Sequence, residues 1–212
     1  PGWHIECSAM SLKHLGERFD IHGGGTDLLF PHHEAEIFQS ECCLGHDPVV
    51  QYWLHNGMIN VDGEKMSKSE GNFWTVSEAL QNVDPLVLRY ALINAPYRQP
   101  VDFNTVMIED SSSHYGRLLS SYSEALHVSK ENHTNPYEIE SLNISSERFI
   151  NGMNDDFNTR KALVEIQAVV KELASLLQSN DRDPIRIGEY VTWLEEFAGG
   201  VLGILPPRKS AF

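Results

Sequence analysis

The sequence predicts an α/β region followed by an all-α region. Up to about residue 100, short apolar segments alternate with turns rich in glycine and histidine. Beyond residue 105, apolar residues recur at three- and four-residue spacing over long stretches, which is typical of packed helices. We therefore expect the boundary between Pro100 and Thr105.

In the first region, segment 19–30 is expected to form a short strand that runs into a glycine turn. Segment 31–43 is expected to be a helix, with Pro31 at its first position, where a missing N–H costs nothing. Residues 51–61 form another short apolar segment, which turn residues interrupt at 55–57.

In the second region, we expect helices at 84–95, 105–130, 158–178 and 185–205, and a connecting loop at 132–146. The clearest helix is 158–178, because it carries a single apolar stripe. The stripe consists of Leu163, Ile166, Val169, Val170, Leu173 and Leu176.

Composition narrows the class of protein. The formal net charge of −14 argues against broad, non-specific nucleic-acid binding, which depends on many lysines and arginines. Three cysteines, two of them adjacent, do not form a disulfide framework and favour a reducing compartment. No apolar run approaches the roughly 20 residues of a membrane helix. We therefore expect a soluble, cytoplasmic protein, and because it begins at Pro1 we expect a piece of a longer polypeptide.

Three stretches carry candidate chemistry, and the first is the run from His22 to Asp27. Its three consecutive glycines let a backbone approach a ligand closely, since no Cβ stands in the way. Asp27 follows at a position from which it could accept hydrogen bonds from a ribose. An ordinary turn is the alternative, because the run is neither a Walker A loop nor a GxGxxG fingerprint.

The second stretch is "PHHEAE", in which His32 and Glu36 lie four residues apart on one face of the expected helix. With Cys7 from a neighbouring strand, they form a set suited to zinc that leaves one coordination position open. His33 is expected to point elsewhere. A surface His–Glu pair beside a buried free cysteine is the alternative.

The third stretch is "GEKMSKSEGN", where Lys65 and Lys68 lie among serines and glycines. Such a loop can wrap a polyphosphate and offset the charge that builds on a leaving pyrophosphate. Two lysines on a solvated loop are the alternative when the stretch is taken by itself.

"KMSKS" at 65–69 is the signature of class I aminoacyl-tRNA synthetases. Together with "PGWHIECSAM", "FDIHGGGTDLLFPHHEAEIFQSE", "YWLHNGM" and "MNDDFNT", it makes the chain resemble cysteinyl-tRNA synthetase over roughly Pro1 to Leu177. The resemblance implies ATP-dependent activation of L-cysteine and its transfer to tRNA(Cys), by a monomer with zinc as cofactor and ATP, with magnesium, as substrate. It also implies the second half of a Rossmann-type nucleotide-binding fold followed by an antiparallel helical bundle along the tRNA.

The resemblance assigns roles to individual positions. Cys7, His32 and Glu36 correspond to zinc ligands, and Trp3 and His4 to residues that line the cysteine pocket. The residues implied for adenosine, adenine and phosphate contacts, the two lysines being catalytic, are Gly24, Asp27, His55, Gly57, Lys65 and Lys68.

Several positions depart from the family pattern, namely Ala35, Glu70 and Asn154, but none is a proposed ligand. The "HIGH" signature and a further zinc cysteine are expected upstream of Pro1, so the missing N-terminal half of the enzyme is an expected partner. The expected domains are half of the catalytic domain, a KMSKS and stem-contact region, and a tRNA-contacting bundle, at 1–62, 63–104 and 105–212.

Two other functions stay open at this point. One is a ligase that joins activated cysteine to a small amino sugar in thiol biosynthesis, because its first half-reaction is the same. The other is a module that binds tRNA or a partner subunit without catalysis. The acceptor used distinguishes the first, and a natural transcript that begins near Pro1 would favour the second.

Overall fold

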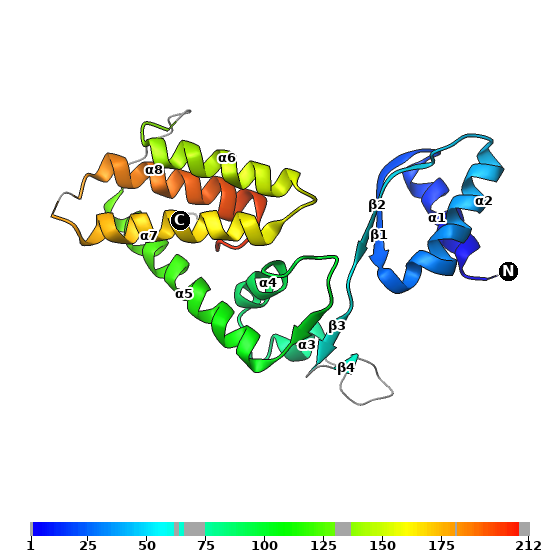
Figure 1. The fold of residues 1–212 in the computed structure, drawn as a ribbon, viewed down its shortest axis with the longest axis horizontal. Helices are drawn as coiled ribbons and strands as arrows, with labels where there is room; N and C mark the ends of the chain where they lie inside the picture. Colours follow the sequence, from blue (N-terminus) through cyan, green and yellow to red (C-terminus); the bar gives the residue numbers. More distant parts are fainter. Residues whose placement is uncertain (1, 62–63, 66–74, 130–136, 181, 208–212) are drawn as a thin grey trace, which may run out of the picture. The chain divides into compact units, whose positions relative to one another are not determined.

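The computed structural model divides into two compact units (Figure 1). The first comprises Pro1–Lys65 with Tyr97–Asp102, and the second comprises Met66–Pro96 with Phe103–Phe212. The residues that the structure describes are 2–61, 64–65, 75–129, 137–180 and 182–207.

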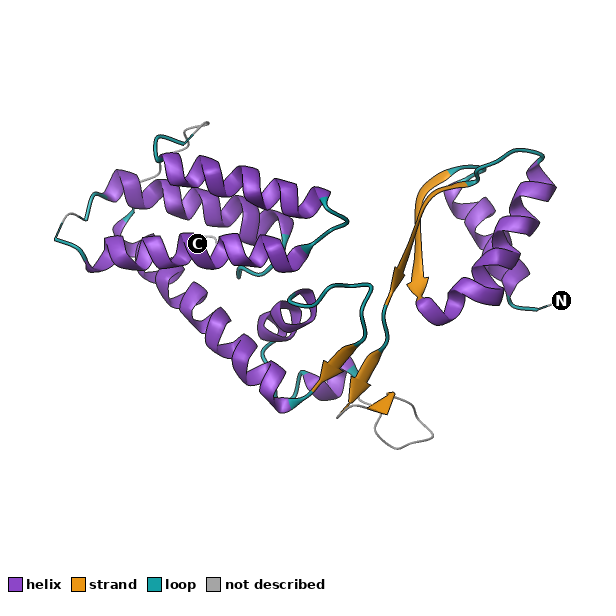
Figure 2. Cartoon of the chain, in the orientation of Figure 1, coloured by secondary structure: helices purple, strands orange, loops and turns teal. Residues whose placement is uncertain are grey.

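In the first unit, helices and strands alternate along the chain (Figure 2). Strands β1 and β2 pair in parallel, from Phe19 opposite Val50 to Gly25 opposite Asn56, so their carboxyl ends lie at the same edge. The elements are α1 (His4–Leu15), β1 (Phe19–Gly25), the short turns η1 (Thr26–Leu28) and η2 (Leu29–His33), α2 (Glu34–Leu44) and β2 (Val50–Asn56).

A second, smaller sheet follows β2, and a glycine makes its close approach possible. The Gly57 N–H donates to the Tyr97 carbonyl at 2.7 Å, and the Val101 N–H donates to the Met58 carbonyl at 2.9 Å. A Cβ on Gly57 would lie 2.6 Å from the Pro100 nitrogen and closer still to the carbonyl of Gln99. The strands, in the order β4-β3-β5, are β3 (Ile59–Val61), β4 (Glu64–Lys65) and β5 (Val101–Phe103).

The second unit is helical, and polar caps define where several helices begin. The Asn104 side chain accepts from the Met107 N–H at 2.9 Å at the start of α5, and Asp84 and Asp183 each precede a proline at the first helical position. The elements are α3 (Val76–Ala79), α4 (Pro85–Ile93), α5 (Thr105–Val128), α6 (Glu140–Asn154), α7 (Thr159–Gln178), α8 (Pro184–Leu194) and η3 (Glu195–Val201).

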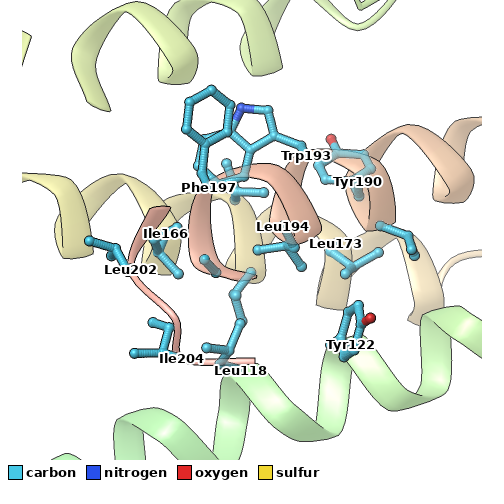
Figure 3. Close-up of a cluster of buried hydrophobic side chains, with 14 of the residues drawn as sticks. Leu118, Tyr122, Ile166, Leu173, Tyr190, Trp193, Leu194, Phe197, Leu202 and Ile204 are labelled. Atoms are coloured by element: carbon cyan, nitrogen blue, oxygen red, sulfur yellow. The ribbon is translucent and has the colours of Figure 1, made fainter. Parts of the chain in front are cut away.

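The hydrophobic core of the second unit lies among α5, α6, α7, α8 and η3. Figure 3 shows Leu118, Ile166 and Leu173 facing Leu194 and Ile204, and all five are fully buried. The stripe predicted for α7 is confirmed as far as Leu173, after which Leu177 is buried and Leu176 only partly so. The prediction of an α/β region followed by an all-α region is therefore confirmed.

Three local predictions in the first unit were wrong. Cys7 lies in helix α1 and not in a strand, and α1 packs against α2. The glycines at 23–25 do not form a turn, because they continue β1 and pair with Leu54, His55 and Asn56 of β2. Helix α2 also begins at Glu34, after the irregular turn η2 that contains Pro31.

The connecting loop predicted at 132–146 was also partly wrong, because α6 begins at Glu140. The buried residues of α6 are spaced three or four apart: Leu142, Ser145, Phe149 and Gly152. Two of the four are not large apolar residues, so the helical stripe is weak in the sequence. Gly152 allows a close approach to α7, since a Cβ there would lie 3.1 Å from the Cβ of Lys161.

The first unit buries little apolar surface. Among its described residues, the buried apolar side chains are those of Val49 and Val50. Ile21 and Tyr52 are opposite each other in the β1–β2 register, hence on one face of the sheet, and are 55% and 62% exposed. None of the described helices has the length and apolar character that crossing a membrane requires.

Candidate active site

Helix α1, the turn η2 and the start of α2 bring Cys7, His32 and Glu36 together. One ligand atom from each lies within 4.8 Å of the other two, although Cys7 is 25 residues before His32 in the sequence. His32 and Glu36 are 6% and 3% exposed, and Cys7 is half-buried. The three residue types and this convergence fit a zinc ion with an open position.

Hydrogen bonding around His32 supports a cation at this point. The Trp3 Nε1–H donates to His32 Nε2 at 3.1 Å, so Nε2 carries no hydrogen of its own. That nitrogen lies 2.7 Å from Oε1 of Glu36, which is buried and without a hydrogen-bond partner among the described residues. A metal ion at His32 would use the lone pair of Nε2 that now accepts from Trp3, and the unpartnered Oε1 of Glu36 lies beside the same nitrogen.

The ionisation of these groups points the same way. Burial raises the pKa of Glu36 to about 7 and lowers the pKa of His32. Burial, followed by the charges of Glu36 and Glu6, raises the pKa of the Cys7 thiol. Without a cation, the site thus disfavours its own charged forms, and a divalent cation would reverse that preference for Glu36 and Cys7.

Trp3 and His4, which the family resemblance predicts to line a cysteine pocket, flank His32. The His4 and Trp3 rings lie 4.9 and 5.2 Å from the His32 ring, and Nδ1 of His4 lies 2.6 Å from Nδ1 of His32. His4 is the first residue of α1 and Trp3 precedes it, so one helix end supplies Cys7 and the two aromatic neighbours of His32.

A second group of imidazoles adjoins the metal site, and sequence reasoning missed it. His22, His33 and Glu36 also bring ligand atoms within 4.8 Å of one another. His33 does not point away as expected: it is 3% exposed, and its Nδ1 lies 2.7 Å from Nε2 of His55. Of the two groups, the one that contains Cys7 fits zinc better, because sulfur is a preferred zinc ligand.

The ring of Trp53 packs against histidines on both strands of the parallel pair. It stacks on His22 with centroids 4.5 Å apart and lies parallel to His55 at 6.4 Å. Burial, followed by neighbouring histidines, lowers the pKa of His33 to about 4 and lowers the pKa of His22. These two imidazoles are therefore neutral at neutral pH.

The residues expected at the nucleotide lie near the carboxyl ends of β1 and β2. Gly24 pairs with His55, and Asp27 is exposed in the turn that follows β1. The carboxyl edge of parallel strands is where open α/β sheets bind ligands. Gly24 also has a packing reason, since a Cβ there would lie 2.8 Å from Cε1 of His33. Gly57 is buried against 99–100.

The two lysines expected at the phosphates fall at the margin of the described structure. Lys65 ends β4 and its backbone pairs with Asn60 of β3. The side chain of Lys65 and the whole of Lys68 lie outside the described residues.

Residues 1–113 match the family described as "tRNA synthetases class I (C) catalytic domain". The chain belongs to the class I cysteinyl-tRNA synthetase family. A second match, to the DALR domain, covers residues 148–206 of the helical unit. The family resemblance of the sequence is therefore confirmed.

Relatives named cysteine–tRNA ligase cover nearly the whole chain. That of Nitrosomonas europaea is 46% identical over 214 residues, which are 99% of this chain and 43% of the relative. That of Geobacter sulfurreducens is 40% identical over 217 residues, which are 100% of this chain and 45% of the relative. This chain of the cysteinyl-tRNA synthetase family thus spans less than half the length of these curated relatives.

Solved structures of other synthetases share the fold. The LeuRS–tRNA–LeuAMS ternary complex of Agrobacterium radiobacter aligns with a TM-score of 0.66 at 20% identity, over 86% of this chain and 26% of that one. A putative arginyl-tRNA synthetase of Campylobacter jejuni aligns with a TM-score of 0.62 at 15% identity, over 97% of this chain and 51% of that one. At these identities the likeness concerns the fold of the cysteinyl-tRNA synthetase chain alone.

Proposed function

We propose that this chain supplies the cysteine-recognising part of a cysteine–tRNA ligase, which activates L-cysteine with ATP and transfers it to tRNA(Cys). The observation that carries the proposal is the convergence of Cys7, His32 and Glu36 within 4.8 Å, beside Trp3 and His4. Because the relatives are more than twice as long as this chain, we assign the complete reaction to the longer protein.

Cys7, His32 and Glu36 would hold zinc, which when bound supplies a contact that favours sulfur over oxygen. Cysteine and serine differ by that one atom, and an apolar pocket cannot separate such similar side chains by a large factor. Trp3 and His4 would flank the side chain of the bound cysteine and so hold the cysteine carboxylate toward the nucleotide. His33 would keep His55 in place through the contact at 2.7 Å between their ring nitrogens.

Activation joins the cysteine carboxylate to ATP. A carboxylate oxygen attacks the α-phosphorus, the bond from that phosphorus to the bridging oxygen breaks, and pyrophosphate leaves with the magnesium that accompanied ATP. Gly24, Asp27, His55 and Gly57 are proposed to contact the adenosine, from the carboxyl edge of the parallel sheet. Lys65 and Lys68 are proposed to offset the charge that builds on the phosphates.

We take tRNA as the acceptor and the cytoplasm as the location. The relatives named above are cysteine–tRNA ligases, and the DALR match in the helical unit favours tRNA over a small amino sugar. All three cysteines are free thiols, which agrees with a reducing compartment.

The test is ATP–pyrophosphate exchange with L-cysteine, followed by transfer to tRNA or to a small amino sugar, using the complete translation product that carries this sequence. We expect exchange with cysteine and not serine, charging of tRNA, and loss of both in Cys7→Ala and His32→Ala. Cys42→Ala, an exposed cysteine of α2, is the matched control. Transfer to the small amine alone, or exchange that survives Cys7→Ala, would refute the proposal.

A further inference from the structure

A hydrogen bond joins helices α1 and α2 close to Cys7 and Glu36. The Ser8 hydroxyl, 8% exposed, lies 3.1 Å from Oε1 of Gln39 on α2 and 3.1 Å from the carbonyl oxygen of His4. A hydroxyl has one hydrogen, so it donates to one of these acceptors at a time. If the Gln39 amide is turned over, Nε2 donates to Ser8 while the hydroxyl donates to His4. Both orientations join the two helices.

The spacing of these residues places the contact on the face of α1 that carries His4 and on the face of α2 that carries Glu36. Along α1, Ser8 directly follows Cys7 and lies one turn after His4. On the facing helix, Gln39 lies three residues after Glu36, hence on the same side. The contact between His4 and His32 lies at the start of the helix pair, and the contact between Ser8 and Gln39 lies near its middle. Cys7 and Glu36 lie between them.

Close packing does not fix the two helices at this level. A cavity of about 160 Å³ lies between α1, α2 and the β1–β2 sheet, and Ser8 and Gln39 are part of its wall. Protein interiors are otherwise packed with few voids larger than a water molecule, and such packing is what normally sets the distance between helices. Beside a cavity, a hydrogen bond therefore carries more of the alignment.

We propose that Ser8 and Gln39 are positioning residues that hold Cys7 at ligand distance from His32 and Glu36. Neither residue binds the metal. Loss of their contact lets α1 rotate or slide along α2, which moves the Cys7 sulfur out of the set. This inference rests on the zinc site proposed above. Groups that hydrogen-bond directly to a metal ligand contribute about 10- to 100-fold to metal affinity, and we take the lower figure, about 10-fold, for these residues, which act on Cys7 through the position of α1.

The test measures the zinc dissociation constant of the 212-residue chain by competition with a chromophoric chelator. Cobalt absorption is a second readout, because the thiolate-to-cobalt band reports whether Cys7 is bound. The variants are Ser8→Ala, Gln39→Leu and the two combined. Ser11→Ala is the matched control, since it makes the same change on α1 in the wall of the same cavity. Ser8→Thr keeps the hydroxyl.

We expect Ser8→Ala and Gln39→Leu each to weaken zinc binding about 10-fold or more and to lower the thiolate-to-cobalt band. The double variant should be no weaker than the single ones, because both remove the same contact. Ser11→Ala and Ser8→Thr should stay within about threefold of the parent chain. Circular dichroism checks folding, and if Ser8→Ala does not fold, Gln39→Leu decides.

Affinity in Ser8→Ala and Gln39→Leu equal to that of Ser11→Ala would overturn the inference, and so would effects of the two that multiply. These outcomes would leave the proposed zinc site intact, because the parent chain still binds. Absence of zinc binding by the parent chain would overturn both.

Discussion

Replacing Gly57 by alanine should destabilise the first unit, and the contacts of the new Cβ indicate how large the loss of stability is. The new Cβ would lie 2.6 Å from the Pro100 nitrogen and closer to the Gln99 carbonyl. These are backbone atoms, so no side chain can rotate away, and the strand pairing that follows Gly57 must shift. Overpacking costs about 1–3 kcal/mol. We expect the upper end, about 3 kcal/mol, because backbone has to move.

Gly23→Ala is the matched comparison, because a Cβ there would only touch the Leu54 carbonyl oxygen at 3.5 Å, an ordinary contact. Its effect should lie between no change and a gain of about 1 kcal/mol from the less flexible unfolded chain. Gly24→Ala should fall between the two, since its Cβ would meet side-chain atoms of His33 and Leu28 at 2.8 and 3.0 Å.

Hydrogen exchange resolved by mass spectrometry measures the opening of β1 and β2 separately from the helical unit. A cost of 3 kcal/mol corresponds to exchange faster by about 100-fold or more in Gly57→Ala. Exchange in Gly57→Ala no faster than in Gly23→Ala would refute the reasoning, because it would mean that the approach of 99–100 to Gly57 is not a tight one.

Three further predictions concern the metal, pH and the bundle. Cys7→Ala should weaken zinc binding at least about 100-fold and abolish the thiolate-to-cobalt band, whereas Cys42→Ala should leave both unchanged. The pKa of His33 is lowered to about 4 in the folded chain, so its contribution to stability is complete above pH 6.5 and is lost as pH falls toward 4. In the metal-free chain this loss of stability should be at most about 3 kcal/mol, and it should be smaller in His33→Gln. Hydrogen exchange at each pH measures it. Glu36, whose pKa is raised to about 7, has the opposite effect on the pH dependence of stability, and it has this effect in the parent chain and in His33→Gln alike. Glu189→Leu should cost the bundle about 2–3 kcal/mol in urea denaturation, because the Glu189 carboxylate accepts the N–H groups of residues 138 and 139 at the start of α6; a cost below about 0.5 kcal/mol would contradict that role.

Local spacing explains what the sequence could predict. The stripe from Leu163 to Leu173 repeats with the period of a helix, and the four-residue step from His32 to Glu36 survives into the structure as a contact of 2.7 Å. Both depend only on residues within a few positions of each other. No local spacing links Cys7 to these two residues, and its assignment to a strand was wrong.

Contacts between distant segments explain what the sequence could not predict. His22 stacks on Trp53 because β1 and β2 pair in parallel with these residues opposite each other, 31 positions apart. No pattern within either strand specifies that register. The burial of His33 follows from the same pairing, because His33 packs against His22, Trp53 and His55. One signal was available: Trp53 and His55 lie at alternate positions of β2 and therefore share a face.

The unequal burial of apolar side chains implies that the two units respond differently to heat. The helical unit contains the connected core around Leu118, Ile166 and Trp193, whereas the described part of the first unit buries only Val49 and Val50 among its apolar residues. Warming should therefore disorder the residues around Cys7 and His32 while the helices are still intact. Heat inactivation would then precede melting, and a denaturation curve that follows helix content would overestimate the temperature at which the site survives.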